Sequence, residues 1–261
     1  MFNMKNFKIS IVASLMAVTS FSALAEDTQD IKDLIVENQP QFQGANIRVN
    51  QELSEYGLEG FHSVNIQGQD LVLTPDGRYA ILGDLFDLSQ MRNITEESRS
   101  AAMGERAGGV ISGMDKDGFI KFSHNDDVEH IGDMYVFTDP TCPFCTRVHQ
   151  EMEEYKTAGV NVYYIPYPRS GINANGRDYQ MLTRALCSDN PQEALNAYKN
   201  QDASVISELD LIDGSACHDT VAAGYNAGQE IGVSGTPFIY LSNGDAIPGY
   251  NPAESIISRL K

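Results

Sequence analysis

The chain has 261 residues, with 36 acidic and 18 basic side chains and a formal net charge of −18 at pH 7. This acidic balance argues against nucleic acid as a partner, because phosphate backbones attract basic surfaces. The four cysteines, at positions 142, 145, 187 and 217, all fall in the C-terminal half. An even cysteine count is typical of a chain that forms disulfides in an oxidising compartment.

The first 25 residues have the pattern of a secretory signal peptide. Lys5 and Lys8 precede an apolar stretch over residues 9–24, and Ala23-Leu24-Ala25 is a small-x-small cleavage site. A membrane anchor is the alternative, but the apolar stretch is short and no cluster of charges follows Ala25. We expect export to a bacterial periplasm and cleavage after Ala25. Because that removes two lysines and no acid, the formal charge falls from −18 to −20.

Residues 26–94 predict a small N-terminal α+β domain. A short amphipathic helix at residues 30–36 precedes short runs of β-forming residues, and Pro75-Asp76-Gly77 is a hairpin turn. The predicted strands are residues 64–66, 71–73 and 79–82. The domain has no cysteine and no concentrated polar cluster, so we expect a structural or associative role.

Residues 95–113 predict a linker helix. Glu96 and Glu97 suit the first turn of a helix, whereas Gly104, Gly108 and Gly109 weaken it. We therefore expect a partly helical, bendable connection. The alternative is a loop within one continuous domain.

Residues 114–261 predict an α/β domain. A strand at 134–138, a helix at 142–156 and a buried strand at 160–165 form a βαβ unit with parallel strands. A mostly helical insertion spans residues 175–227. After it we expect a hairpin of strands 237–241 and 245–248 across Asn243-Gly244, and a closing helix at 252–260.

The sequence Cys142-Pro143-Phe144-Cys145 places two sulfurs where the first strand turns into its helix. Unpaired N–H groups at a helix start stabilise a thiolate, so we expect Cys142 to be an exposed nucleophile and Cys145 to lie one turn inside. Pro143 suits the first helical turn. This spacing indicates thiol-disulfide exchange and leaves Cys187 and Cys217 to form a second, structural bridge.

A CxxC sequence is also half of many zinc sites, and His149 lies on the same helix face as Cys145. Neither His124 nor His130 belongs to a second cluster of ligands, so we expect no metal and read His149 as a residue of the helix face.

The neighbours of the cysteines have two readings each. Asp139 and Thr141 are interpreted as capping or turn residues, with an effect of Asp139 on the pKa of the nearby sulfur as the alternative. Arg169 either adds positive potential near the site or lies in a solvated loop. Phe144 contacts substrate or packs against the protein.

Thr236-Pro237 begins an apolar strand. Proline is unusual in a central strand, because it has no N–H to donate to the neighbouring strand. A cis peptide bond would turn the preceding backbone outward beside the sulfurs, where it can pair with an extended peptide. A trans proline at a strand start is the alternative.

With these residues, the chain resembles thioredoxin-fold proteins, and in particular the periplasmic disulfide isomerases of the DsbC/DsbG type. The resemblance extends from the signal peptide and the segment Leu71 to Gly77, through Phe137-Thr138-Asp139 before the CxxC, to Gly235-Thr236-Pro237 and Pro248-Gly249-Tyr250. It implies a C-terminal thioredoxin-like fold with a helical insertion and a cystatin-like N-terminal dimerisation domain.

The resemblance also implies a function. It predicts a homodimer that reshuffles or reduces wrong disulfides in exported proteins, needs no cofactor and is kept reduced by a membrane thiol reductase of the DsbD type. Cys142 and Cys145 become the redox pair, Pro143, Phe144, Thr236 and Pro237 the substrate-binding residues, and Cys187 with Cys217 the fixed bridge.

Three alternatives stay open. Pro143-Phe144 is nearer to the Pro-Tyr of DsbG-type members, while Gly-Thr-Pro matches the DsbC type better. The first alternative function is a DsbG-like reductase of oxidised cysteines and the second is a net thiol oxidase; both would use the same residues. The third is a dimeric holdase chaperone, which would not require the cysteines.

Overall fold

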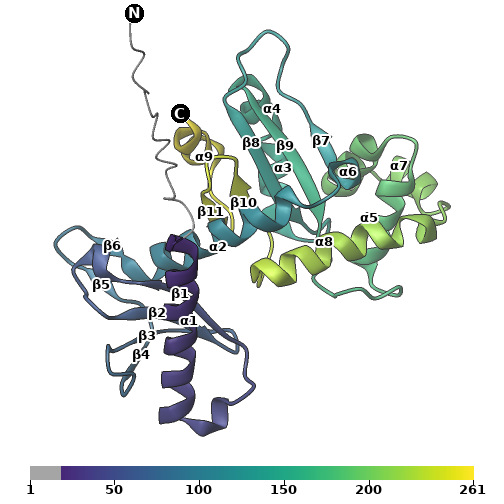
Figure 1. The fold of residues 1–261 in the computed structure, drawn as a ribbon. Coiled ribbons are helices and arrows are strands. Elements are labelled where there is room, and N and C mark those ends of the chain that lie inside the picture. The colour runs from purple at the N-terminus through teal and green to yellow at the C-terminus, as the bar shows by residue number, and fades with distance from the viewer. Residues whose placement is uncertain (1–18) are drawn as a thin grey trace, which may run out of the picture. The chain divides into compact units, whose positions relative to one another are not determined.

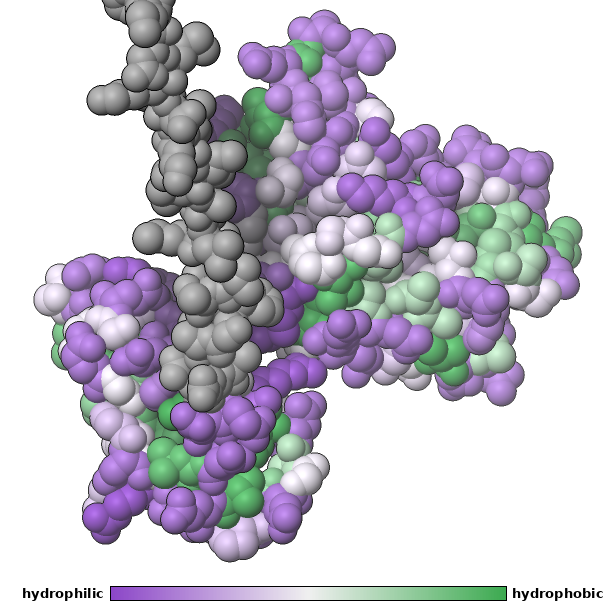
Figure 2. Space-filling model, in the orientation of Figure 1, coloured by the Kyte–Doolittle hydropathy of each residue, from purple (hydrophilic) through white to green (hydrophobic). Residues whose placement is uncertain are grey.

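A computed structural model of the protein describes the backbone of residues 19–261 and the side chains from Thr28 onward. Residues 1–18 of the predicted signal peptide therefore lie outside the described residues. The chain divides into two compact units, an N-terminal unit that ends at Thr95 and a C-terminal unit from Glu96 to Lys261. The face drawn in Figure 2 is mostly hydrophilic in both units, as the acidic composition predicts.

The N-terminal unit is an antiparallel sheet of order β1-β2-β3-β4 packed against helix α1, with a separate hairpin of β5 and β6 (Figure 1). Its elements are α1 (Thr19–Asn38), η1 (Pro40–Phe42), β1 (Ile47–Glu52), η2 (Ser54–Tyr56), β2 (His62–Ile66), β3 (Gln69–Leu73), β4 (Ala80–Leu82), β5 (Phe86–Asp87) and β6 (Arg92–Asn93). Helix α1 buries Ile35 against apolar side chains of β1, β2 and β3.

Sequence patterns found part of this sheet. The predicted turn at Pro75-Asp76-Gly77 does join β3 to β4: Gly77 has a φ of 66°, and its N–H donates to the carbonyl of Thr74 over 2.8 Å. Strand β1 was missed, because its register shifts between Val49 and Gln51 and its polar residues hide the alternation.

The C-terminal unit is built on a five-stranded sheet of order β11-β10-β8-β9-β7. The strands are β7 (Ile120–Phe122), β8 (Gly132–Thr138), β9 (Val160–Pro166), β10 (Phe238–Leu241) and β11 (Ala246–Pro248). The predicted βαβ unit is present, since β8 and β9 pair in parallel, and β10 and β11 form the predicted hairpin. The edge strand β7 was not predicted.

Helices cover both faces of this sheet. They are α2 (Ile94–Ser112), η3 (Lys116–Gly118), α3 (Pro143–Gln150), α4 (Met152–Thr157), α5 (Arg177–Cys187), α6 (Pro191–Asn200), α7 (Ala203–Leu209), η4 (Gly214–Cys217), α8 (His218–Ile231) and α9 (Ala253–Leu260). Successive residues of β8 alternate between the faces: Met134 and Val136 pack with α3 to α7 and α9, Tyr135 and Phe137 with α2 and α8. In Figure 1, α5 to α7 gather at one end of the unit.

Helix α2 corrects the expectation of a bendable linker. It is continuous, and Met103, Ala107 and Ile111 are buried in the core of the C-terminal unit. A Cβ atom at Gly104 would lie 2.2 Å from the carbonyl oxygen of Gly244, and one at Gly108 would lie 2.8 Å from the Tyr240 hydroxyl. These glycines therefore allow close packing of α2 on the β10–β11 hairpin rather than bending.

The predicted helix at 142–156 is two helices. It breaks at Glu151, whose carboxylate accepts hydrogen bonds from the Tyr250 hydroxyl at 2.5 Å and from the Ala253 N–H at 3.0 Å. Glu151 therefore caps the start of α9, which explains why a helix-forming residue stands at a helix boundary.

Candidate redox site

The two sulfurs of the CxxC lie where β8 leads into α3. Cys142 is the N-terminal cap residue of α3, with extended backbone angles and no capping bond from its side chain, and Pro143 occupies the first turn. The N–H groups of this turn consequently face the sulfur instead of a side-chain cap.

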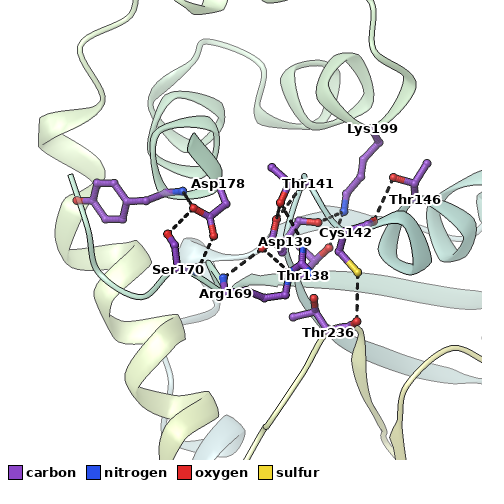
Figure 3. Close-up of polar contacts among 11 residues, drawn as sticks. Thr138, Asp139, Thr141, Cys142, Thr146, Arg169, Ser170, Asp178, Lys199 and Thr236 are labelled. Atoms are coloured by element: carbon purple, nitrogen blue, oxygen red, sulfur yellow. Dashed lines mark hydrogen bonds and ion pairs between the residues drawn. The ribbon is translucent and has the colours of Figure 1, made fainter. Parts of the chain in front are cut away.

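Cys142 is buried, with 2% of its surface exposed, which corrects the expected exposure. Its thiol donates a hydrogen bond to the carbonyl of Thr236 over 3.2 Å, so the loop before β10 covers it (Figure 3). The pKa of Cys142 is lowered to about 5, first by a hydrogen bond from Cys145 and then by the Thr236 side chain and the N–H groups of Cys145 and Phe144, against the opposing effect of burial. The thiolate is thus the stable form at neutral pH.

Cys145 has the opposite character. It is fully buried, and burial raises the pKa of its thiol far above the ordinary value, with its hydrogen bond to Cys142 acting in the same direction. Two groups oppose this rise, the ammonium group of Lys199 and the backbone N–H of Asp139. The pair therefore consists of an ionised sulfur and a protonated one.

The peptide bond between Thr236 and Pro237 is cis. Apart from the Thr236 carbonyl, which accepts from Cys142, this loop presents the Thr236 hydroxyl, which is buried without a partner among the described residues. That hydroxyl lowers the pKa of Cys142, so it acts as a donor once the sulfur has lost its proton. One residue can therefore serve both protonation states of the nucleophile.

Asp139, Thr141 and Arg169 form a network beside the cysteines (Figure 3). The buried carboxylate of Asp139 accepts from the N–H and hydroxyl of Thr141 at 2.7 and 2.6 Å, and from the N–H and Nε of Arg169 at 3.1 and 2.9 Å. Although burial opposes ionisation, these bonds lower the pKa of Asp139. Asp139 and Thr141 thus form a turn, as interpreted, and Arg169 is an ion-pair partner rather than a free loop residue.

His149 is buried, and its ring nitrogens face the Tyr164 hydroxyl at 3.1 Å and the Asn196 amide oxygen at 2.7 Å. Burial, followed by the charge of Lys199, lowers its pKa to about 4, so the ring is neutral at pH 7. No group of three or more potential metal ligands occurs among the described residues.

Phe144 is half exposed next to Cys142. Its ring stacks on Tyr250 with centroids 6.3 Å apart, and the guanidinium of Arg147 lies over both rings at 5.4 and 5.9 Å. The i, i+3 spacing of Phe144 and Arg147 is a signal in the sequence, whereas the approach of Tyr250 from a distant loop is not.

The other two cysteines, Cys187 and Cys217, form a disulfide with an S–S distance of 2.05 Å. It links the last residue of α5 to the last residue of η4, far along the chain from the CxxC. Sequence reasoning missed Lys199, a buried lysine on α6 whose sequence surroundings give no sign of burial.

Comparison with known proteins agrees with this geometry. Residues 130–261 match the family profile described as a thioredoxin-like domain, and residues 22–96 match the disulfide bond isomerase protein N-terminal domain. The first match alone covers more than half of the chain. The chain belongs to the thioredoxin-like family.

Its relatives are thiol:disulfide interchange proteins. DsbC of Dickeya dadantii is 28% identical over 80% of this chain and 79% of its own length, and DsbG of Pseudomonas aeruginosa is 26% identical over 72% of each. A solved structure of a linker-deletion mutant of ScsC from Proteus mirabilis superposes with a TM-score of 0.50 over 64% of this chain and 86% of that one. At 18% identity it supports the fold alone.

These findings confirm the predicted DsbC/DsbG resemblance and the mixed α/β fold with its thioredoxin-like domain. They also confirm the predicted enzyme class, a thiol:disulfide oxidoreductase. Within residues 19–261, no helix combines the length and hydrophobicity needed to cross a bilayer.

Proposed function

We propose that this thiol:disulfide oxidoreductase works as a disulfide isomerase in which Cys142 is the attacking residue and Cys145 the resolving one. The observation that carries the proposal is the split of the pair: the pKa of Cys142 falls to about 5 while that of Cys145 rises. A nucleophile must be ionised to attack, and a resolving thiol must stay inactive until it is needed.

The reaction begins when the Cys142 thiolate attacks one sulfur of a substrate disulfide. That S–S bond breaks, the other substrate sulfur leaves as a thiolate, and Cys142 is joined to the substrate. A second substrate thiolate then attacks the substrate sulfur and releases Cys142, so the disulfide is moved without net oxidation. If none attacks, Cys145 displaces the substrate, which is reduced by two electrons while the pair becomes a disulfide.

The Thr236–Pro237 loop and Phe144 are proposed as substrate-binding residues. The Thr236 carbonyl lies 3.2 Å from the Cys142 sulfur, so a peptide that pairs with this backbone would bring its own sulfur to the nucleophile. The half-exposed ring of Phe144, two residues after Cys142, offers an apolar contact to the same substrate. Such contacts suit unfolded or wrongly disulfide-bonded proteins, because they recognise exposed backbone and apolar side chains rather than a defined sequence.

We place the protein in the periplasm, exported by residues 1–25 and cleaved after Ala25. A membrane thiol reductase of the DsbD type is proposed to return two electrons to the oxidised pair. The apolar leader and the likeness to DsbC and DsbG support both proposals.

The N-terminal unit is proposed to join two copies of the chain. Strand β4 is the edge of its sheet and all its residues are exposed. Large apolar side chains in and around it are exposed too: Tyr79, Ile81, Leu82, Phe86, Leu88 and Met91. An open strand edge beside apolar side chains favours association, and residues 22–96 match an isomerase N-terminal domain.

The division of the chain after Thr95 supports the boundary of the N-terminal domain. We assign dimerisation to residues 26–94 and catalysis to residues 114–261, joined by the helix at 95–113, which packs on the C-terminal unit. Sedimentation of the full chain tests the dimer. Leu82→Lys should yield monomers, whereas Leu211→Lys, at a still more exposed apolar residue of the C-terminal unit, should not.

Reactivation of scrambled ribonuclease tests the function. We expect activity from the unsubstituted protein and none from Cys142→Ala. Oxidation of dithiols without reactivation would favour a net oxidase, and selective reduction of sulfenylated cysteines would favour a DsbG-like reductase. Protection of unfolded chains that survives replacement of both Cys142 and Cys145 would indicate a holdase chaperone.

A further inference from the structure

Lys199, on helix α6, is a buried lysine that the reaction described above does not use. Only 2% of its surface is exposed, and its Nζ donates to the Thr138 hydroxyl at 2.8 Å and to the Asp139 carbonyl at 2.9 Å (Figure 3). Both partners are neutral, and none of the described carboxylates forms an ion pair with it. Lysine is almost never buried without a negative partner, so this arrangement needs an explanation.

The two anchors of Lys199 connect it to Cys145. Thr138 ends β8, and Asp139 begins the loop that leads into α3. The carbonyl of Asp139 faces Lys199, while its N–H acts on the sulfur of Cys145. The backbone of Asp139 thus interacts with both Lys199 and the resolving cysteine.

Of the groups around Lys199, Cys145 is the one that becomes negatively charged during resolution. The Asp139 carboxylate is held by Arg169 and Thr141, and His149 is neutral. Burial lowers the pKa of Lys199, Arg169 lowers it further, and among the groups that raise it Cys145 comes first, followed by Asp139 and Cys142. In turn, the charge of Lys199 lowers the pKa of Cys145.

We propose that Lys199 is a positioning residue for the resolving step, in which it holds the Asp139 backbone against Cys145 and stabilises that residue as a thiolate. The proposal rests on the proposed function, since it assigns a partner to the cysteine that closes the reduction cycle.

The step balances as follows. Cys145 loses its proton, and its thiolate attacks the Cys142 sulfur of the mixed disulfide. The bond between Cys142 and the substrate sulfur breaks, the bond between Cys142 and Cys145 forms, and the substrate leaves as a thiolate. The proton that Cys145 gives up passes to the solvent buffer, where it balances the charge of the departing substrate thiolate.

The experiment follows both steps in the reduced, full-length protein with a chromogenic nitrobenzoate disulfide. Attack by Cys142 releases a first coloured thiolate, and resolution by Cys145 releases a second. Lys199→Met removes the charge and the hydrogen bonds, whereas Lys199→Gln removes the charge and keeps a donor. Lys121→Met, at an exposed lysine of β7, is the matched control.

We expect Lys199→Met and Lys199→Gln to slow the second release by about tenfold or more and to move its pH profile upward, because a nearby opposite charge lowers a thiol pKa by about one unit or more. The first release should change by less than about twofold, and Lys121→Met should change neither.

Three results would overturn the proposal: an unaltered second release, equal slowing of both releases, or wild-type behaviour of Lys199→Gln. The second of these is what a purely structural lysine would give. Failure of the proposed function looks different, because the unsubstituted protein would then show no fast first release at neutral pH.

Discussion

The two cysteine pairs of the C-terminal unit share one fold but differ in their surroundings. Cys142 and Cys145 lie at a helix start, among N–H groups, a loop carbonyl and a buried lysine, and remain free thiols of opposite pKa shift. Cys187 and Cys217 lie at the ends of α5 and η4 and form a closed disulfide. Spacing along the chain alone does not decide which pair exchanges disulfides; the groups around the sulfurs do.

The largest expected effect comes from Cys142→Ser. The hydroxyl that replaces the sulfur is not ionised at neutral pH, so reactivation of scrambled ribonuclease should fall by about a thousandfold or more, to the uncatalysed rate. Removing the second pair, in Cys187→Ser/Cys217→Ser, should leave this activity within about twofold at low temperature. Activity that survives in the first variant and vanishes in the second would reverse the roles of the two pairs.

Measurements of stability should show the opposite ranking, with the larger effect from the second cysteine pair. The bridge between Cys187 and Cys217 closes a loop of 30 residues, so its loss should lower the free energy of unfolding by about 3–4 kcal/mol. Guanidinium unfolding of the full chain measures it. Cys142→Ser/Cys145→Ser is the matched control and should lower the free energy of unfolding by less. Equal decreases in both variants would contradict a structural role for the second bridge.

The pH dependence of Cys142 sharpens the contrast further. Since its pKa is lowered to about 5, alkylation should be fast above that pH and lost as pH falls through about 5. Thr236→Val removes a donor to the thiolate and should raise the pKa of Cys142 by about one unit. At a pH below the midpoint, alkylation of this variant should be about tenfold slower than that of the unsubstituted protein. Thiolate absorbance follows both proteins, and a midpoint near 9 in the unsubstituted chain would remove the basis for the nucleophile.

The smallest effect is expected at the aromatic platform. Phe144→Ala removes a half-exposed ring that stacks on Tyr250, and should raise KM for an unfolded protein substrate by about threefold with kcat little changed. Ile172→Ala, at another exposed apolar residue of the same unit, is the control. Equal changes in both variants would show that Phe144 has no special contact with substrate.

Sequence patterns revealed the parts of the site that depend on local chemistry. The CxxC at a strand-to-helix junction and the hairpin at Asn243-Gly244 are encoded by neighbouring residues, and the structure contains both. Lys199 and the packing of Gly104 on Gly244 depend on segments that meet only after folding. A lysine in a polar helix and a glycine in a linker look ordinary until a distant backbone atom approaches them.

The capping of α9 by Glu151 has a consequence for the end of the chain. The helix that carries the reactive sulfurs is followed at once by a residue whose carboxylate is bonded to Tyr250 and Ala253. Cutting the chain back to Gly249 would remove these two donors, leaving the carboxylate only the Tyr155 hydroxyl at 3.4 Å, and would uncover the α4 residues beneath α9. The last dozen residues, although remote from the sulfurs in sequence, therefore belong to the scaffold of the reaction, and an affinity tag is better placed after Lys261 than in exchange for them.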